Sequence, residues 1–305
     1  MSETITRSGI ITIIGRPNVG KSTLTNAIVG EKIAIVSEKP QTTRIRINGI
    51  LTKGETQFVF IDTPGMHKAH NKLSQAMVKT IRTSIEDINV AVLMADCTRK
   101  ISATETDFIK SFNERGIPVV LVLNKVDLLK DRAEVLKVIA AYSEMGEIAE
   151  IIPVSVKNKE NTDAIIPILE KFAVESPHYF SDDMPTDQPE KIWLSEIVRE
   201  KLLNSLYEEI PHGIAVEIES MEFAKTNSGK DIVDLGVVII CEKQSHKGMI
   251  IGKQGAMLKK IGSVARAEME EYFESKVNMK IWVKVKEDWR NRESVIADLG
   301  LDTEE

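Results

Sequence analysis

The sequence predicts an α/β protein of two domains: an α/β domain with a mostly parallel sheet, then a smaller α+β domain. Two apolar runs, 90–95 and 118–123, are typical of strands buried on both faces of a parallel sheet. A proline-rich, acidic stretch then interrupts the apolar pattern and marks a linker. Beyond it the pattern changes to α-β-β-α-α-β. We expect the first domain at 1–174, a linker at 175–191, the second domain at 192–290 and an acidic tail at 291–305.

Composition bounds the class of protein. Of the 305 residues, 42% are hydrophobic and 28% charged, as in soluble globular proteins. The net charge of −6 does not indicate a nucleic-acid binder, so any basic surface must be local. Cys97 and Cys241 each follow an apolar run and are expected to be reduced, cytosolic residues. No window approaches 18 consecutive apolar residues, and the first residues lack the apolar segment of a signal peptide, so we expect neither secretion nor a membrane span.

The first motif is a phosphate-binding loop. Residues 15–22 fit G-x-x-x-x-G-K-[ST] and lie between a β-branched apolar run and a helix-compatible segment, 24–29. In such a loop backbone N–H groups cradle phosphate oxygens, Lys21 reaches the terminal phosphates and Ser22 offers a hydroxyl to Mg²⁺. The sequence therefore predicts a nucleoside triphosphate site. Its first group of residues is Gly15, Arg16, Pro17, Asn18, Val19, Gly20, Lys21, Ser22 and Thr23.

Two strands are expected at 46–51 and 57–62. A second motif follows the later one. Asp62, Thr63, Pro64 and Gly65 come directly at its end. The Asp62 carboxylate can reach Mg²⁺ through a water, and the Gly65 N–H can contact a γ-phosphate. D-x-x-G alone is weak, since roughly one copy is expected by chance. Its position after the phosphate loop gives it value.

A third motif selects the base. Asn124, Lys125 and Asp127 form N-K-x-D at the end of the run 118–123. An Asp carboxylate accepts hydrogen bonds from N1 and N2 of guanine, a donor pair that adenine lacks. The Asn124 amide can serve N7 and the loop, and the Lys125 stem can lie over the purine ring. A further strand, 150–154, leads into a weaker signal whose backbone N–H can meet guanine O6. Its residues are Ser155, Val156 and Lys157.

These three motifs together resemble the signature set of small GTPases, and the wording of residues 15–22 is similar to the bacterial GTPases related to Era, Der and MnmE. The resemblance implies a P-loop GTPase domain that converts GTP to GDP and phosphate with Mg²⁺. It also implies that a threonine between the first two strands ligates Mg²⁺ only when γ-phosphate is present. Both Thr42 and Thr43 fit, and Thr43 is favoured because Thr43-Arg44 matches the related pattern; the alternative is two solvated loop threonines. The expected metal ligands are Ser22, Thr43 and Asp62, and the expected catalytic residues are Lys21, Asn18 and Gly65.

One departure concerns hydrolysis. Ras-like enzymes place a Gln after D-x-x-G to orient water, whereas this chain has Met66, which has no suitable donor or acceptor. Hydrolysis should therefore be slow without help. His67 could act as a base, although a solvent-facing histidine is the simpler interpretation. Asn18 offers another route, because its amide oxygen can hold K⁺ where an arginine finger would otherwise place charge.

The second domain carries a glycine turn within a basic band. Residues 243–266 contain five lysines and one arginine and no acidic residue, a local charge of +6. Such a band can follow a phosphate backbone, and bare glycines let the chain approach it closely. The alternative is a helix turn with a solvated charged face. The expected RNA-binding residues are Lys247, Gly248, Ile251, Gly252, Lys253, Gln254, Gly255 and Lys259.

This half resembles a type II KH domain, and the ending 284–290 is similar to the C-terminus of the Era family. The resemblance covers residues 9–290. It implies a GTP-hydrolysing switch in small ribosomal subunit assembly and 16S rRNA processing, which grips single-stranded RNA near the 16S rRNA 3′ end. It further implies a cytoplasmic monomer with peripheral contact to the inner membrane. Two other functions stay open: an RNA-binding module with a non-hydrolysing nucleotide domain, and a membrane-signalling GTPase.

Overall fold

The computed structural model describes residues 5–65, 71–85, 87–131, 133–206, 210–226 and 229–301. Met66 and His67 lie outside these residues. The chain divides into two compact units. The first unit contains the described parts of Met1–Ala34, Thr43–Lys68 and Val78–Asp187. The second unit contains the described parts of Ile35–Thr42, Ala69–Met77 and Gln188–Glu305.

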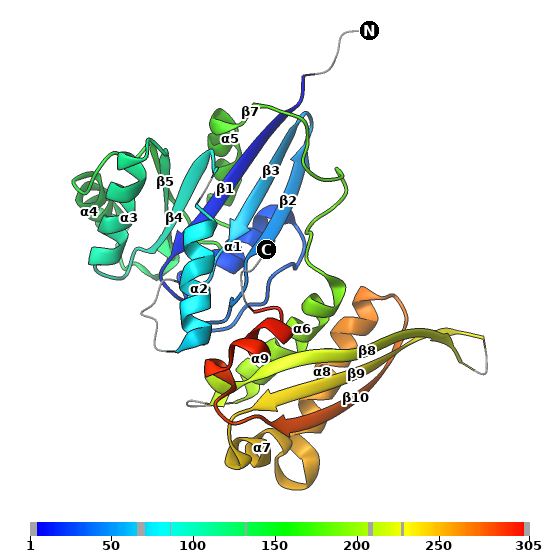
Figure 1. Ribbon diagram of the computed structural model, residues 1–305. Helices are drawn as coiled ribbons and strands as arrows, with labels where there is room; N and C mark the ends of the chain where they lie inside the picture. Colours follow the sequence, from blue (N-terminus) through cyan, green and yellow to red (C-terminus); the bar gives the residue numbers. More distant parts are fainter. Residues whose placement is uncertain are drawn as a thin grey trace. The chain divides into compact units, whose positions relative to one another are not determined.

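The first unit is built on a mostly parallel sheet with the order β2-β3-β1-β4-β5-β6 (Figure 1). Strands β1, β3, β4, β5 and β6 are parallel, and β2 runs antiparallel to β3 at the edge. Parallel strands place their carboxyl ends at one edge, which is where the three nucleotide motifs lie. The strands are β1 (Arg7–Gly15), β2 (Ile47–Lys53), β3 (Thr56–Asp62), β4 (Val90–Asp96), β5 (Val119–Asn124) and β6 (Glu150–Pro153).

Helices cover both faces of this sheet because its central strands are apolar on both sides. On one face Val92 and Val122 pack with Leu24 of α1 and Leu169 of α5. On the other face Leu93 and Leu121 pack with residues of α3 and α4. The predicted α/β domain is thus observed. Its helices are α1 (Lys21–Val29), α3 (Ala103–Glu114), α4 (Ala133–Ser143) and α5 (Ile165–Leu169), together with the second half of α2 (Lys72–Thr83).

The expected linker at 175–191 differs from the structure over much of its length. Strand β7 (Val174–Glu175) pairs antiparallel with β1, and the unit boundary falls between Asp187 and Gln188. Gln57 holds the intervening chain: its Oε1 accepts from the N–H groups of Tyr179 and Phe180 at 2.8 and 3.0 Å, and its Nε2 donates to the Phe180 carbonyl at 2.9 Å. This stretch lacks an apolar pattern, and hydrogen bonds with a side chain of β3 hold it in place.

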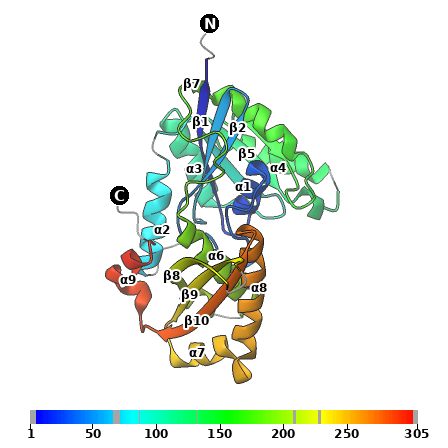
Figure 2. The same ribbon diagram turned by 90° about the vertical axis from the view of Figure 1, so that its right-hand side faces the viewer.

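The second unit has the predicted order α-β-β-α-α-β. Its sheet has the order β10-β9-β8, with β9 parallel to β10 and antiparallel to β8. Helices α6 and α8 pack on one face through residues such as Leu194, Ile197 and Ile261. Figure 2 shows α8 and α9 on opposite sides of the three strands. The elements are α6 (Glu190–Ser205), β8 (Ala215–Lys225), β9 (Asp231–Cys241), α7 (Gln244–Ile251), α8 (Ala256–Tyr272), β10 (Lys276–Val285) and α9 (Glu293–Asp298).

Part of the expected acidic tail is folded. Helix α9 places Ile296 and Leu299 against Trp289, which is fully buried and donates its indole N–H to the Gly213 carbonyl at 2.9 Å. This cluster covers the sheet face opposite α6 and α8, and it also contains Leu73 from the start of α2. The acidic composition of 291–305 concealed these few apolar anchors.

Two expectations about the surroundings of the chain can be compared with the described residues. Cys97 and Cys241 are both buried and free. Burial raises the pKa of Cys97 to about 11, which keeps this thiol protonated at neutral pH. In the part of the chain that the structure describes, no helix is both long and apolar enough to cross a membrane.

Candidate nucleotide and RNA sites

The phosphate loop connects β1 to the first turn of α1. Helix α1 starts at Lys21, directly after Gly20 in a left-handed conformation, so its first N–H groups face the loop. The Lys21 ammonium donates to the carbonyls of Gly15 and Arg16 at 3.2 and 3.4 Å. Gly65 lies beside this loop: a Cβ there would stand 2.9 Å from the Cα of Pro17, so only glycine fits. The structure thus brings the first two predicted motifs together.

Lys21 and Asp62 are buried charges of opposite sign. Lys21 is 6% exposed and Asp62 is 0% exposed. Desolvation lowers the pKa of Lys21 to about 8, against the attraction of Asp62. Desolvation likewise raises the pKa of Asp62 to about 6, against Lys21, the Ser22 hydroxyl and the Thr63 N–H. Each charge therefore costs free energy in the ligand-free protein, and a bound phosphate and cation would relieve that cost.

Three oxygen-bearing side chains converge where the sequence predicts Mg²⁺. Ser22 Oγ donates to Asp62 Oδ2 at 2.6 Å and lies 2.8 Å from Thr43 Oγ1. Asp62 Oδ1 is buried and has no hydrogen-bond partner among the described residues. Hydroxyl and carboxylate oxygens suit Mg²⁺, which usually takes few protein ligands and shares phosphate and water. The described residues contain no cluster of three or more His, Cys, Asp or Glu that could hold a metal.

The geometry distinguishes the two threonines. Thr42 Oγ1 donates to the Lys39 carbonyl at 2.7 Å and so closes a local turn. Thr43 is 7% exposed, and its hydroxyl is the one that lies beside Ser22. This arrangement supports Thr43 as the ligand.

The base-binding motif lies at the end of β5. Asn124 Nδ2 donates to the Val19 carbonyl at 2.7 Å, and its Oδ1 accepts from the Val156 N–H at 3.0 Å. The Asn124 amide thus ties the phosphate loop to the loop at Ser155, Val156 and Lys157, which agrees with the contact to the loop that the sequence suggested. Asp127 is half-buried, in a 3₁₀ turn directly after Lys125. The phosphate loop, the N-K-x-D motif and the loop at 155–157 therefore meet at one edge of the sheet.

Asp96 is a site residue that the sequence argument missed. Its Oδ2 accepts from Lys125 Nζ at 2.8 Å, and its Oδ1 accepts from the N–H and hydroxyl of Thr98 at 3.0 and 2.6 Å. Lys125 Nζ also donates to the Asn18 carbonyl at 2.9 Å. Desolvation raises the pKa of Asp96, but the bonds from Lys125 and Thr98 outweigh it and lower the pKa. The signal was present, because Asp96 ends its strand as Asp62 and Asn124 end theirs.

The glycine turn of the second unit joins α7 to α8. Gly252 has φ 73°, and a Cβ there would stand 2.7 Å from the Cβ of Met257, so a side chain would strain the turn. The predicted RNA-binding residues occupy three consecutive places along the chain. Lys247, Gly248 and Ile251 lie on α7, Gly252, Lys253 and Gln254 lie in the turn, and Gly255 and Lys259 lie at the start of α8.

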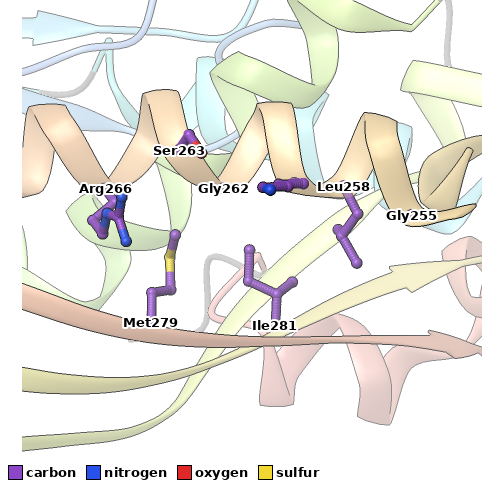
Figure 3. A pocket seen from close by; sticks show the side chains of 8 residues that line it. Gly255, Leu258, Gly262, Ser263, Arg266, Met279 and Ile281 are labelled. Atoms are coloured by element: carbon purple, nitrogen blue, oxygen red, sulfur yellow. The ribbon is translucent and has the colours of Figure 1, made fainter.

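A groove of about 420 Å³ runs between α8 and β10 (Figure 3). Leu258, Met279 and Ile281 point into it from the helix and the strand, and Arg266 lines it beside Met279. Of the predicted residues, Gly255 and Lys259 line it. Gly262, Ser263 and Arg266 also line it and were missed, although they repeat at helical spacing from Gly255 and Lys259. A groove lined by both apolar and basic side chains suits unpaired bases joined by phosphates.

Comparison with known proteins identifies the family. A family model described as 50S ribosome-binding GTPase matches residues 10–125, and a KH domain model matches residues 209–290. GTPase Era of Clostridioides difficile (strain 630) is 46% identical over 294 residues, which cover 96% of this chain and 98% of that protein. The chain belongs to the Era family. It is accordingly a GTPase, and the predicted fold, a P-loop GTPase domain followed by a KH domain, is confirmed.

Two solved structures of Era match the whole chain. One is Era in complex with MgGDPNP and nucleotides 1506–1542 of 16S ribosomal RNA, with a TM-score of 0.92 and 34% identity over 98% of this chain and 100% of that chain. The other is a variant of Aquifex aeolicus Era bound to GDP·AlF4⁻, with the same TM-score, identity and coverage. The similarity therefore extends over both units.

The raised pKa of Asp62 predicts a pH dependence of stability. Because the folded carboxyl holds its proton to about pH 6 and the unfolded one only to about 3.8, Asp62 stabilises the fold at low pH. This contribution is lost as pH rises through that window, by up to about 3 kcal/mol. In protein free of nucleotide and Mg²⁺, Asp62→Asn should therefore gain stability over wild type between pH 4 and 7, as measured by urea unfolding.

Asp96→Asn is the matched control, because its pKa is lowered. Its stability contribution is present above the unfolded pKa and lost as pH falls, so this variant should lose stability relative to wild type over the same interval. Parallel stability curves for wild type and Asp62→Asn would contradict the assignment.

Proposed function

We propose that this chain is a GTP-driven switch that binds single-stranded RNA and acts in small ribosomal subunit assembly and 16S rRNA processing. The target would be the 3′ region of 16S rRNA. The observation that carries the proposal is the full-length similarity to an Era structure that holds both MgGDPNP and 16S rRNA nucleotides 1506–1542. The two sites of this chain have the chemistry for these two ligands.

The nucleotide site would act through positioning and charge. Lys21, which now donates to loop carbonyls, would turn its ammonium to the terminal phosphates of GTP. Ser22 and Thr43 would offer hydroxyls, and Asp62 its carboxylate, to Mg²⁺, which when bound offsets charge that develops on the phosphate oxygens. The Gly65 N–H would meet the γ-phosphate beside the loop. Loss of γ-phosphate would remove the contacts that hold Thr43 and Gly65.

Guanine recognition would rest on Asp127 and its supports. The Asp127 carboxylate would accept from N1 and N2 of the base, and Lys125 would cover the ring. Asp96 holds Lys125 by a 2.8 Å ion pair, so the stem has a fixed direction before the base arrives. GTP and GDP share this contact, which therefore serves affinity and not the switch.

The RNA site would use the groove between α8 and β10. Leu258, Met279 and Ile281 offer apolar surface to the bases, while Lys259 and Arg266 face the backbone phosphates. The glycine turn would let the RNA backbone approach the start of α8. The same proposal includes direct RNA contacts by the predicted residues between Lys247 and Gln254.

The test of the switch is RNA affinity in three nucleotide states. We expect the full-length protein to bind a single-stranded oligoribonucleotide of the 16S 3′ region with different affinity when it is empty, bound to GDP, or bound to a non-hydrolysable GTP analogue. Coupling of this kind is typically worth 5- to 150-fold, and RNA must change the GTP-to-GDP preference by the same factor. Equal RNA affinity in all three states, measured by fluorescence anisotropy, would refute the switch.

The groove predicts how affinity depends on salt. Each phosphate contact removed from single-stranded RNA should reduce the slope of log affinity against log salt by about 0.7. Lys259→Ala and Arg266→Ala should each do so, with weaker binding to all sequences. Lys276→Ala is the matched control, because Lys276 is exposed on β10, pairs with Glu270 at 3.2 Å and does not line the groove. If the control and the groove variants lose affinity and slope equally, the groove is not the site.

Asn18 predicts a cation requirement for hydrolysis. Lys125 holds its backbone carbonyl, and the residue has φ 63°, so the loop fixes its position. With its amide oxygen as a K⁺ ligand, turnover should be at least about tenfold faster in KCl than in NaCl of equal ionic strength. Asn18→Ala should remove the difference. Equal wild-type rates in the two salts would dispose of the cation site.

A cytoplasmic location, a monomeric state and peripheral contact with the inner membrane stay predictions of the family resemblance. The alternative function is that of a membrane-signalling GTPase without an RNA partner. The basic residues Lys259 and Arg266, which line the groove, favour RNA binding. RNA affinity that ignores salt would favour that alternative.

A further inference from the structure

A short segment between the first two nucleotide motifs belongs to the second unit. Ile35–Thr42 clusters with the described part of Gln188–Glu305, and the chain returns to the first unit at Thr43. Ile35 is 1% exposed and packs in the apolar cluster of α6, β9 and α8. The segment that precedes the expected Mg²⁺ ligand is therefore anchored by the helix that opens the second unit.

Two consecutive residues of α6 hold the two ends of this segment. At its start, Glu200 Oε1 accepts from the Val36 N–H at 2.9 Å. At its end, Arg199 Nη2 donates to the Thr42 carbonyl. Between them the Thr42 hydroxyl donates to the Lys39 carbonyl, which makes the segment a compact turn. The backbone is thus fixed at both ends and within.

The guanidinium that makes the second contact is itself fixed. Arg199 is 2% exposed and Glu196 is 7% exposed. Arg199 donates from Nε to Glu196 Oε1 at 2.6 Å and from Nη2 to Glu196 Oε2 at 2.5 Å, a bidentate pair one helical turn apart. A buried ion pair of this kind is a weak contributor to net stability. Its directed contact to a loop carbonyl suggests another task.

We propose that Arg199 is a positioning residue for the Thr43 hydroxyl, acting through the Thr42 carbonyl. The Thr42 C=O and the Thr43 N–H belong to one planar peptide unit, so a fixed carbonyl fixes the plane from which Thr43 extends. The Thr43 hydroxyl then stands 2.8 Å from Ser22 Oγ, within the proposed Mg²⁺ set. The inference rests on the proposed role of Thr43 as the ligand that senses γ-phosphate.

The energetic consequence falls on GTP and not on GDP. Ordering one residue costs backbone entropy, and Arg199 meets this cost before nucleotide binds. Without the contact, GTP must order the Thr42–Thr43 peptide on binding. GDP, which under the proposed function does not engage Thr43, bears no such cost. The Mg²⁺-dependent preference for GTP over GDP should therefore shrink about tenfold.

The experiment compares dissociation constants of a non-hydrolysable GTP analogue and GDP, with and without Mg²⁺, in full-length protein. Arg199→Lys keeps a positive charge beside Glu196 but loses the planar fork. We expect about tenfold weaker Mg²⁺-dependent binding of the analogue and unchanged GDP binding. Arg290→Lys is the matched control, because Arg290 makes the same bidentate pair with Glu242, at 2.9 and 2.7 Å, and should leave both constants unchanged.

A double-variant cycle separates positioning from a merely structural role. Because Arg199 acts through Thr43, Arg199→Lys should have no further effect in a Thr43→Ala background. If Arg199→Lys fails to fold, Arg199→Met with Glu196→Leu removes both buried charges and should give the same tenfold loss.

Two results would overturn the inference. If Thr43→Ala abolishes the preference for the GTP analogue while the Arg199 variants keep it, Thr43 has its proposed role and Arg199 does not position it. If Thr43→Ala itself leaves the preference unchanged, the proposed role of Thr43 fails and the inference fails with it.

Discussion

The first unit depends on a pair of opposite charges buried beneath the phosphate loop. Lys21 and Asp62 lose hydration on folding, and their mutual attraction offsets this only in part, because burial is the largest influence on both pKa values. Asp62 Oδ1 also has no hydrogen-bond partner among the described residues. A phosphate and a divalent cation would supply what each group lacks. Burial of these two charges thus costs stability at a place where a bound nucleotide and cation would restore it.

Two stretches of the chain that adjoin the nucleotide motifs belong to the second unit. The segment before Thr43 is held by α6, and the start of α2, which follows the D-x-x-G motif, contributes Leu73 and Met77 to the cluster around Trp289. Both stretches, which adjoin the residues proposed to contact the γ-phosphate, therefore carry anchors in the second unit. A switch needs an element whose two arrangements are biased by both ligands. Under the proposed function, these two stretches would fill that role.

Local patterns predicted the parts of each site that come from strand ends and turns. Asp62 and Asn124 were found because each begins a motif of fixed spacing at the end of an apolar strand, where parallel strands expose their carboxyl ends. Asp96 ends its strand in the same way, but it belongs to no motif with a fixed spacing, so its ion pair with Lys125 was missed. The groove residues Ser263 and Arg266 were missed for a similar reason: their helical spacing becomes a surface only when β10 lies opposite. Amino-acid composition did not predict which parts of the expected linker and tail are held by a few specific residues. Gln57 secures much of the expected linker, and Leu299 secures part of the expected tail.

The sequence by itself determined the class of this protein: a GTPase domain with a phosphate loop, and a second domain with a basic glycine turn, because these rest on residue types at short, fixed spacings. The tertiary structure decided which groups meet across long separations. It placed the Thr43 hydroxyl 2.8 Å from Ser22 Oγ, bonded the Asn124 amide to two loops, and joined Arg199 to Thr42, 157 residues apart along the chain. Such contacts leave no local pattern, since a hydrogen bond depends on position in space and not on position in the chain.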